Sequence, residues 1–259
     1  MNTFFNFFSL KRQYENATTA ELSKVEPIAE NKNQLAPSLP AAVRNYLKYC
    51  GYSENDQFTY CNVKWKSAHL KMAPGKNWSQ LFCEQVNFIK WPARIVYMKT
   101  KLWGLPLEAT DKFQNGHGSM LIKVLKYFNV TNAKGPEMDA AELVTILAEA
   151  MLIPVYFFQP YITWTELNPF AVKGTIKYGD VEASGIFYFN DYCELLRFET
   201  NDRYYTHNGK SEKFKWTAYA WNYKTFDRLK YPSNFMATWS LPSGDHTYFK
   251  GRLEGLYYA

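Results

Sequence analysis

Apolar and polar residues alternate along most of this chain. In residues 57–72, for example, Cys61 and Val63 fall on one side of an extended segment, while Asn62 and Lys64 fall on the other. A period of two is typical of a β-strand with one dry face. Further segments rich in aromatic and β-branched residues are separated by turn residues. We predict strands over residues 57–72, 78–89, 93–103, 105–113, 118–128, 155–164, 170–178, 181–189, 195–200, 214–226, 234–241 and 248–258.

Two segments have helical spacing instead. The first begins near Ser38, which can cap a helix, and ends at Gly51. The second covers residues 139–152, where apolar side chains repeat at helical intervals as a broad stripe until Pro154 ends it. Each helix therefore has an apolar face that must pack on another element.

The first part of the chain shows no such pattern. Residues 16–37 are polar and lack a sustained period, apart from one short helical segment at residues 19–24. We predict a lead-in segment over residues 1–37 and a single domain over residues 38–259, since all-β domains often reach this length.

About a dozen strands with two or three packing helices indicate the fold class. A flat sheet of this many strands would twist apart or expose long edges. We predict a mainly β (α+β) protein in which one large curved antiparallel sheet forms a half-barrel closed by the helices.

Composition narrows the classes of function. Aromatic residues make up 18% of the chain, and the net charge of +6 is spread over many segments. Dispersed charge argues against nucleic acid. The four cysteines have no CxxC spacing and the histidines are scattered, so we expect free thiols and no metal site. No phosphate or dinucleotide motif is present, and we expect no cofactor.

The start of the chain bears on location. The apolar run within residues 1–12 is short and is followed by basic residues, unlike a signal peptide. No stretch approaches the roughly twenty apolar residues that span a bilayer. We expect a cytoplasmic protein without stable membrane insertion, in which Phe4, Phe5, Phe7 and Phe8 pack on the domain or, alternatively, dip into a membrane surface. The pattern does not determine the oligomeric state.

The second helix supplies candidate proton carriers. Glu142 and Glu149 lie on nearly the same side, at the edge of the apolar stripe. In a half-dry pocket a carboxyl group has a raised pKa and can carry a proton near neutral pH. Alternatively Glu142 completes a capping box with Asp139. His117, between two glycines, is either a general base or an exposed turn histidine.

A second polar group lies further along the chain. Arg203 and Tyr205, just before a predicted turn at Asn208, bring a guanidinium and a phenol together. A planar guanidinium binds a carboxylate at two points, so this group could clamp an acidic ligand. The alternative is a structural ion pair with Asp111 or Glu149. Asp111 is itself either a site residue or a turn-capping residue.

Large aromatic residues form the most prominent candidate site. On a curved sheet that its helices do not fill, such rings would line a ligand pocket and orient what is bound. Ordinary core packing is the alternative for each of them. The candidates are Trp65, Trp103, Trp164, Trp216, Trp221, Trp239, Tyr188, Tyr219 and Tyr248.

Several motifs carry a family resemblance. They are Gly104-Leu105-Pro106-Leu107, Asp111-Lys112-Phe113, residues 115–120, Gly135-Pro136-Glu137, Arg203-Tyr204-Tyr205, residues 239–244 and Tyr248-Phe249-Lys250-Gly251. From about Ser38 onward the chain resembles a bacterial family of domains with no assigned function. The resemblance implies a lipoprotein-carrier half-barrel, in which a bent antiparallel sheet wraps a helical plug around an apolar cavity. This fold also hosts a cofactor-free enzyme of bacterial pigment biosynthesis, so it leaves the function open.

Three functions remain under consideration. The first is a module that binds an apolar or aromatic small molecule in its cavity. The second is a cofactor-independent cyclase or isomerase that moves a proton with a pocket carboxylate or tyrosine. The third is a scaffold with an exposed aromatic patch. Convergence of Glu149, Arg203 or Asp111 inside a cavity would favour chemistry, and an apolar pocket would favour binding.

Overall fold

The computed structural model describes residues 9–25, 39–102, 104–207 and 210–259. The predictions for the phenylalanine cluster, for Ser38, for Trp103 and for the turn at Asn208 lie outside the described residues.

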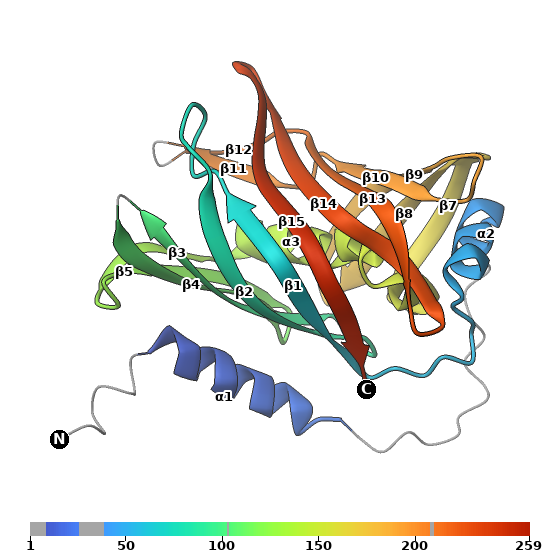
Figure 1. The fold of residues 1–259 in the computed structure, drawn as a ribbon, viewed down its shortest axis with the longest axis horizontal. Coiled ribbons are helices and arrows are strands. Elements are labelled where there is room, and N and C mark those ends of the chain that lie inside the picture. Colours follow the sequence, from blue (N-terminus) through green and yellow to red (C-terminus); the bar gives the residue numbers. More distant parts are fainter. Residues whose placement is uncertain (1–8, 26–38, 103, 208–209) are drawn as a thin grey trace.

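One antiparallel sheet dominates the fold (Figure 1). Its strands are β1 (Tyr60–Leu70), β2 (Ser79–Phe88), β3 (Ala93–Leu102), β4 (Leu105–Gln114), β5 (His117–Val124), β6 (Phe128–Lys134), β7 (Ile162–Asn168), β8 (Ala171–Tyr178), β9 (Val181–Phe189), β10 (Leu195–Thr200), β13 (Trp216–Phe226), β14 (Leu229–Leu241) and β15 (Gly244–Tyr258). Their spatial order is β6-β5-β4-β3-β2-β1-β15-β14-β13-β10-β9-β8-β7. The predicted fold class, one large curved antiparallel sheet with packing helices, is confirmed.

The strand order explains how the sheet encloses a space. Hairpins carry the chain outward from β1 to the edge strand β6, and later inward from the opposite edge strand β7 to β15, which pairs with β1. The segment between the two edges holds the helix α3 (Pro136–Ala148) and two 3-10 turns, η2 (Glu149–Met151) and η3 (Pro154–Phe158). This connection lies within the curve of the sheet (Figure 1), so we call the sheet face toward α3 the inner face.

α3 is buried on nearly every side rather than along one stripe. All residues from Ala141 to Ala148 are buried. The helix begins at Pro136, three residues before the predicted start, and Gly135 precedes it in a left-handed conformation with φ 105°. The capping box predicted at Asp139 and Glu142 is therefore wrong, because both residues lie inside the helix.

The helix α2 (Ala41–Cys50) agrees with the first predicted helix. Gly51 ends it in a left-handed conformation with φ 79°. Its apolar face, including Val43 and Tyr46, is fully buried in the main core. Tyr46 packs against rings of η3 and β9, Phe157 at 5.8 Å and Phe189 at 5.7 Å. α2 thus covers the inner face at the β7–β10 side of the sheet.

The predicted lead-in is more ordered than expected. The helix α1 (Leu10–Leu22) replaces the short helix predicted at residues 19–24. Ala17 packs with Phe88 and Ile95 on the outer face, and the buried carboxylate of Glu21 accepts a hydrogen bond from Trp91 Nε1 at 2.7 Å. Tertiary packing on β2 and β3 therefore stabilises a helix whose sequence has only a weak period.

Two further segments differ from the prediction. The strand expected at residues 155–164 begins only at Ile162, because Pro154 starts the 3-10 turn η3. A short hairpin, β11 (Tyr204–His207) and β12 (Lys210–Lys213), forms a separate two-stranded sheet beside the large one. Within the described residues, no helix is long and apolar enough to cross a membrane.

Candidate ligand-binding site

A cavity of about 350 Å³ lies between the inner face of the sheet and α3. Strands from both halves of the sheet line it, together with Thr145 and Ala148 of α3 and Glu149 of η2. α3 therefore plugs only part of the space inside the sheet. Most of the wall is apolar, including Leu81, Val96, Met98, Leu107, Ala109, Met120, Ile122, Phe235, Ala237 and Phe249. The volume lies within the range of small-molecule pockets.

Five of the predicted aromatic residues line this cavity. They come from four strands that are adjacent in the sheet: β1 and the three consecutive strands β13, β14 and β15 at the end of the chain. Trp216 is tied to this wall, since its Nε1 donates a hydrogen bond to Tyr248 Oη at 3.1 Å. The five are Trp65, Trp216, Trp239, Tyr248 and Tyr219, of which Tyr219 lies in the outward row of β13 and also lines a depression on the outer face.

Three other predicted aromatic residues lie elsewhere. Trp221 is 43% exposed on the outer face. Tyr188 packs under Arg197, whose Cζ lies 3.9 Å from the ring centre. Trp164 stacks on Phe157 at 4.7 Å in the core. Aromatic content thus identified the wall but not each member, because alternation along a strand sends successive rings to opposite faces.

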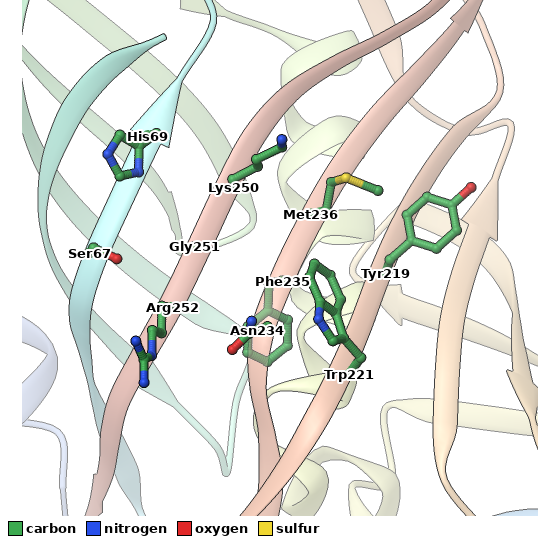
Figure 2. Close-up of a pocket in the computed structure, with 10 residues that line it drawn as sticks. All are labelled: Ser67, His69, Tyr219, Trp221, Asn234, Phe235, Met236, Lys250, Gly251 and Arg252. Carbon is green, nitrogen blue, oxygen red and sulfur yellow. The ribbon is translucent and has the colours of Figure 1, made fainter.

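A second depression, of about 510 Å³, lies on the outer face (Figure 2). Strand register places its side chains in two rows across β13, β14, β15 and β1. One row is Tyr219, Met236, Lys250 and His69, and the other is Trp221, Asn234, Arg252 and Ser67. This depression is more open than the cavity between α3 and the sheet.

A charged cluster forms one part of the cavity wall. Arg94, on β3, extends from the inner face toward three carboxylates. Its Nη1 lies 2.9 Å from Asp111 Oδ2 and 3.2 Å from Glu142 Oε2, and its Nε lies 2.7 Å from Glu149 Oε1. Burial alone would lower the pKa of Arg94, but the three acidic groups raise it well above its ordinary value. Arg94 therefore stays charged and is the centre of the cluster.

Glu149 is held firmly as an acceptor. Besides Arg94, it accepts hydrogen bonds from Gln85 Nε2 at 2.9 Å and Asn87 Nδ2 at 2.5 Å. Asn87 also donates to the hydroxyl of Tyr156 at 3.1 Å. The predicted role of Glu149 as a proton carrier loses support, since donors already surround both of its oxygens.

Glu142 and Asp111 form a close pair of carboxyl groups. Burial raises the pKa of Glu142 well above its ordinary value, the neighbouring Asp111 raises it further, and Arg94 and Arg203 oppose the shift. Glu142 is buried beside Arg94 and is not among the residues that line the cavity. Asp111 lines the cavity, and its Oδ1 is buried without a hydrogen-bond partner among the described residues. Glu142, with its raised pKa, thus lies beside a second carboxyl group that lines the cavity.

Arg203 also lines the cavity, but on the opposite half of the chain. Its guanidinium carbon lies 4.5 Å from the ring centre of Trp216 and 5.8 Å from that of Trp239. Of the two alternatives for Arg203, the ion pair with Asp111 or Glu149 is not found among the described residues, because both carboxylates bind Arg94. Tyr205 packs edge-on against Trp239 at 5.4 Å, behind the cavity wall.

His117 does not reach the cavity. Its side chain is 82% exposed, and its Nδ1 lies 3.5 Å from Asp139 Oδ2. The other oxygen of Asp139 accepts a hydrogen bond from Gly118 N at 2.6 Å. His117 is therefore the exposed turn histidine of the two alternatives, and Asp139 ties the β5 start to α3.

Sequence reasoning missed Arg94, Gln85 and Asn87. Arg94 had a signal: it occupies the inward row of β3 together with apolar Val96, where a charged residue needs a buried partner. Gln85 and Asn87 gave a similar signal in the sequence. They alternate with Val86 and Phe88 on β2, whose end is buried on both faces.

Other chemistry at the cavity is restricted. Cys83 lines it, but burial raises the pKa of its thiol to about 12, so it is not a nucleophile at neutral pH. In the part of the chain that the structure describes, no three His, Cys, Asp or Glu residues are grouped to hold a metal ion.

The fold and the cavity define a class of protein: a single open, curved antiparallel sheet that encloses an apolar cavity with one charged cluster. Sequence comparison then gives the family. A model described as a family of unknown function, DUF6544, matches residues 28–251, and the chain belongs to this family. The resemblance to a family with no assigned function is confirmed. A comparison with curated proteins gives no match.

Two solved structures are similar in shape. A LolA superfamily protein from Nitrosomonas europaea has a TM-score of 0.48 and 9% identity, covering 85% of this chain and 94% of that one. A domain described as an outer membrane lipoprotein-sorting protein, from Vibrio parahaemolyticus, has a TM-score of 0.39 and 9% identity, covering 84% and 90%.

Proposed function

We propose that this protein binds an apolar or aromatic small molecule in the cavity between α3 and the inner face of the sheet. The observation that carries the proposal is the cavity itself, about 350 Å³ with a wall of methionine, aliphatic and tryptophan side chains. Enclosed apolar walls of this kind favour apolar ligands, and flexible methionines adapt to ligand shape.

A titration with phenylnaphthylamine, a neutral apolar fluorophore, tests the proposal. We expect saturable binding by the wild-type protein. Met98→Trp places a bulky ring inside the cavity and should weaken binding by about tenfold or more, a loss of about 1.4 kcal/mol. Lys99→Trp, on the next residue of the same strand, points outward and serves as the matched control. Absence of saturable binding, or equal binding by Met98→Trp, would refute the proposal.

A second candidate is a cofactor-independent enzyme that moves a proton within the cavity. The pairing of Asp111, whose Oδ1 is buried without a partner among the described residues, with Glu142, whose pKa is raised, favours it. A carboxyl group with a raised pKa can act as an acid, and a neighbouring carboxylate can act as a base.

Isotope exchange tests the second candidate. Native mass spectrometry of the protein purified from its own host would identify a retained small molecule, which is then incubated with protein in deuterated water. Wild-type protein should exchange a carbon-bound hydrogen of that molecule, and Asp111→Asn should slow the exchange by about a hundredfold or more. No exchange with wild-type protein would leave binding as the function.

A further inference from the structure

We propose that the ligand carries a carboxylate at one end and that Arg203 binds it. This inference rests on the proposed binding function and names the chemical class of the ligand: a small amphiphile with an apolar body and an acidic head.

Arg203 has hydrogen-bonding capacity that the protein leaves unused. Its Nε is buried and has no hydrogen-bond partner within the described residues. Leaving a buried donor without a partner destabilises the structure, because its bond to water is lost and not replaced. Arg203 lines the apolar cavity, so a ligand acceptor placed there would remove that cost.

The two tryptophans fix the orientation of the guanidinium. The ring centres of Trp216 and Trp239 lie 4.5 and 5.8 Å from its carbon, so aromatic rings occupy its surroundings while its Nε has no hydrogen-bond partner among the described residues. Trp216 is itself held by its hydrogen bond to Tyr248. A pre-oriented planar fork matches the two oxygens of a carboxylate, and less side-chain entropy is lost on binding.

The acidic groups of the protein are already engaged elsewhere. Arg94 pairs with Asp111, Glu142 and Glu149, each within 3.2 Å. Arg203 forms no ion pair of this length with any described residue. Glu142 interacts electrostatically with Arg203 but is paired directly with Arg94. An anionic head group would therefore meet a cation that has no direct carboxylate partner among the described residues, beside a wall of low polarity that strengthens the attraction.

The test displaces phenylnaphthylamine with ten-carbon chains that differ only in their head group: decanoate, decanol and decyltrimethylammonium. We expect decanoate to displace the dye at a concentration about tenfold below that of decanol, and the ammonium to be the weakest. Arg203→Gln should bring decanoate to the level of decanol. Arg252→Gln, on the outer face (Figure 2), should keep the preference for decanoate.

The outcomes separate this inference from the proposed function. Equal displacement of the dye by decanoate and decanol would contradict the inference that the ligand is acidic, and it would leave the proposed apolar binding intact. A preference for decanoate that survives Arg203→Gln would overturn the role of Arg203. If the dye does not bind to the wild-type protein, the proposed function itself fails. Should Arg203→Gln not fold, the head-group series on wild-type protein still decides the ligand class.

Discussion

At the scale of single residues, the cavity wall depends on one buried cation. Arg94 is 10% exposed and pairs with three carboxyl groups from β4, α3 and η2. Loss of one partner from a buried ion pair costs about 3–5 kcal/mol, since a charge is left without compensation. The cluster therefore fastens α3 to the first half of the sheet through a single side chain.

The protonation of Glu142 gives a prediction on pH. Its pKa is raised in the folded protein, so above about pH 4.5 the unfolded chain releases a proton that the folded chain keeps. The free energy of unfolding should fall as the pH rises, by at most about 1.4 kcal/mol per pH unit from this group, until the folded pKa is passed. Glu142→Gln should remove this contribution, as measured by urea denaturation between pH 5 and 8.

The difference between wild type and variant isolates Glu142 from other titrating groups. Glu254→Gln, which removes an exposed partner of Lys64, is the control and should follow the wild-type curve closely. A wild-type curve parallel to that of Glu142→Gln across the whole range would show that Glu142 is charged in the folded state.

At the scale of elements, the close contact between β5 and the start of α3 positions the helix against the sheet. Gly118 lies directly against the backbone of Met138 and Asp139, so a Cβ atom there would collide with the carbonyl oxygen of Met138. Its amide also donates to Asp139. A hairpin strand and a buried helix meet here with no room for a side chain.

We predict that Gly118→Ala destabilises the protein by about 1–3 kcal/mol, because the clash involves backbone that cannot move freely. Gly255→Ala is the matched control, since the nearest atoms there belong to the side chain of Tyr257, which can shift. Thermal unfolding followed by circular dichroism measures both. A Gly118→Ala variant as stable as wild type would mean that α3 is not seated on β5 as described.

At the scale of the whole molecule, the curved sheet brings the two halves of the chain around one space. The first and last strands, β1 and β15, pair along their length, with Val63 opposite Leu256 and Leu70 opposite Phe249. Arg94 reaches the cavity from β3, and Arg203 reaches it from the segment between β10 and β11. The cavity therefore forms only when both halves of the chain are folded around it, and no single segment encloses it.

The local pattern of apolar and polar residues predicted most of the strands, but it predicted the ends of the helices less well. Alternation and turn residues located β1 to β5 and β8 to β10 closely, because one wet face produces a period of two. The pattern does not predict the strand β6. It predicts a strand across η3, because the aromatic residues of η3 have a strong β propensity. α1 was underestimated because its stability comes from packing on the sheet.

The sequence by itself determined the strand-rich class, the aromatic wall and the candidates Asp111, Glu149 and Arg203, since alternation and residue chemistry are local properties. Only the tertiary structure decided that Arg94 is the partner of the carboxylates, that Trp221 faces outward and that α3 leaves part of the interior open. These features depend on strand register and on contacts between residues far apart in the chain, for which a single sequence carries no local signal.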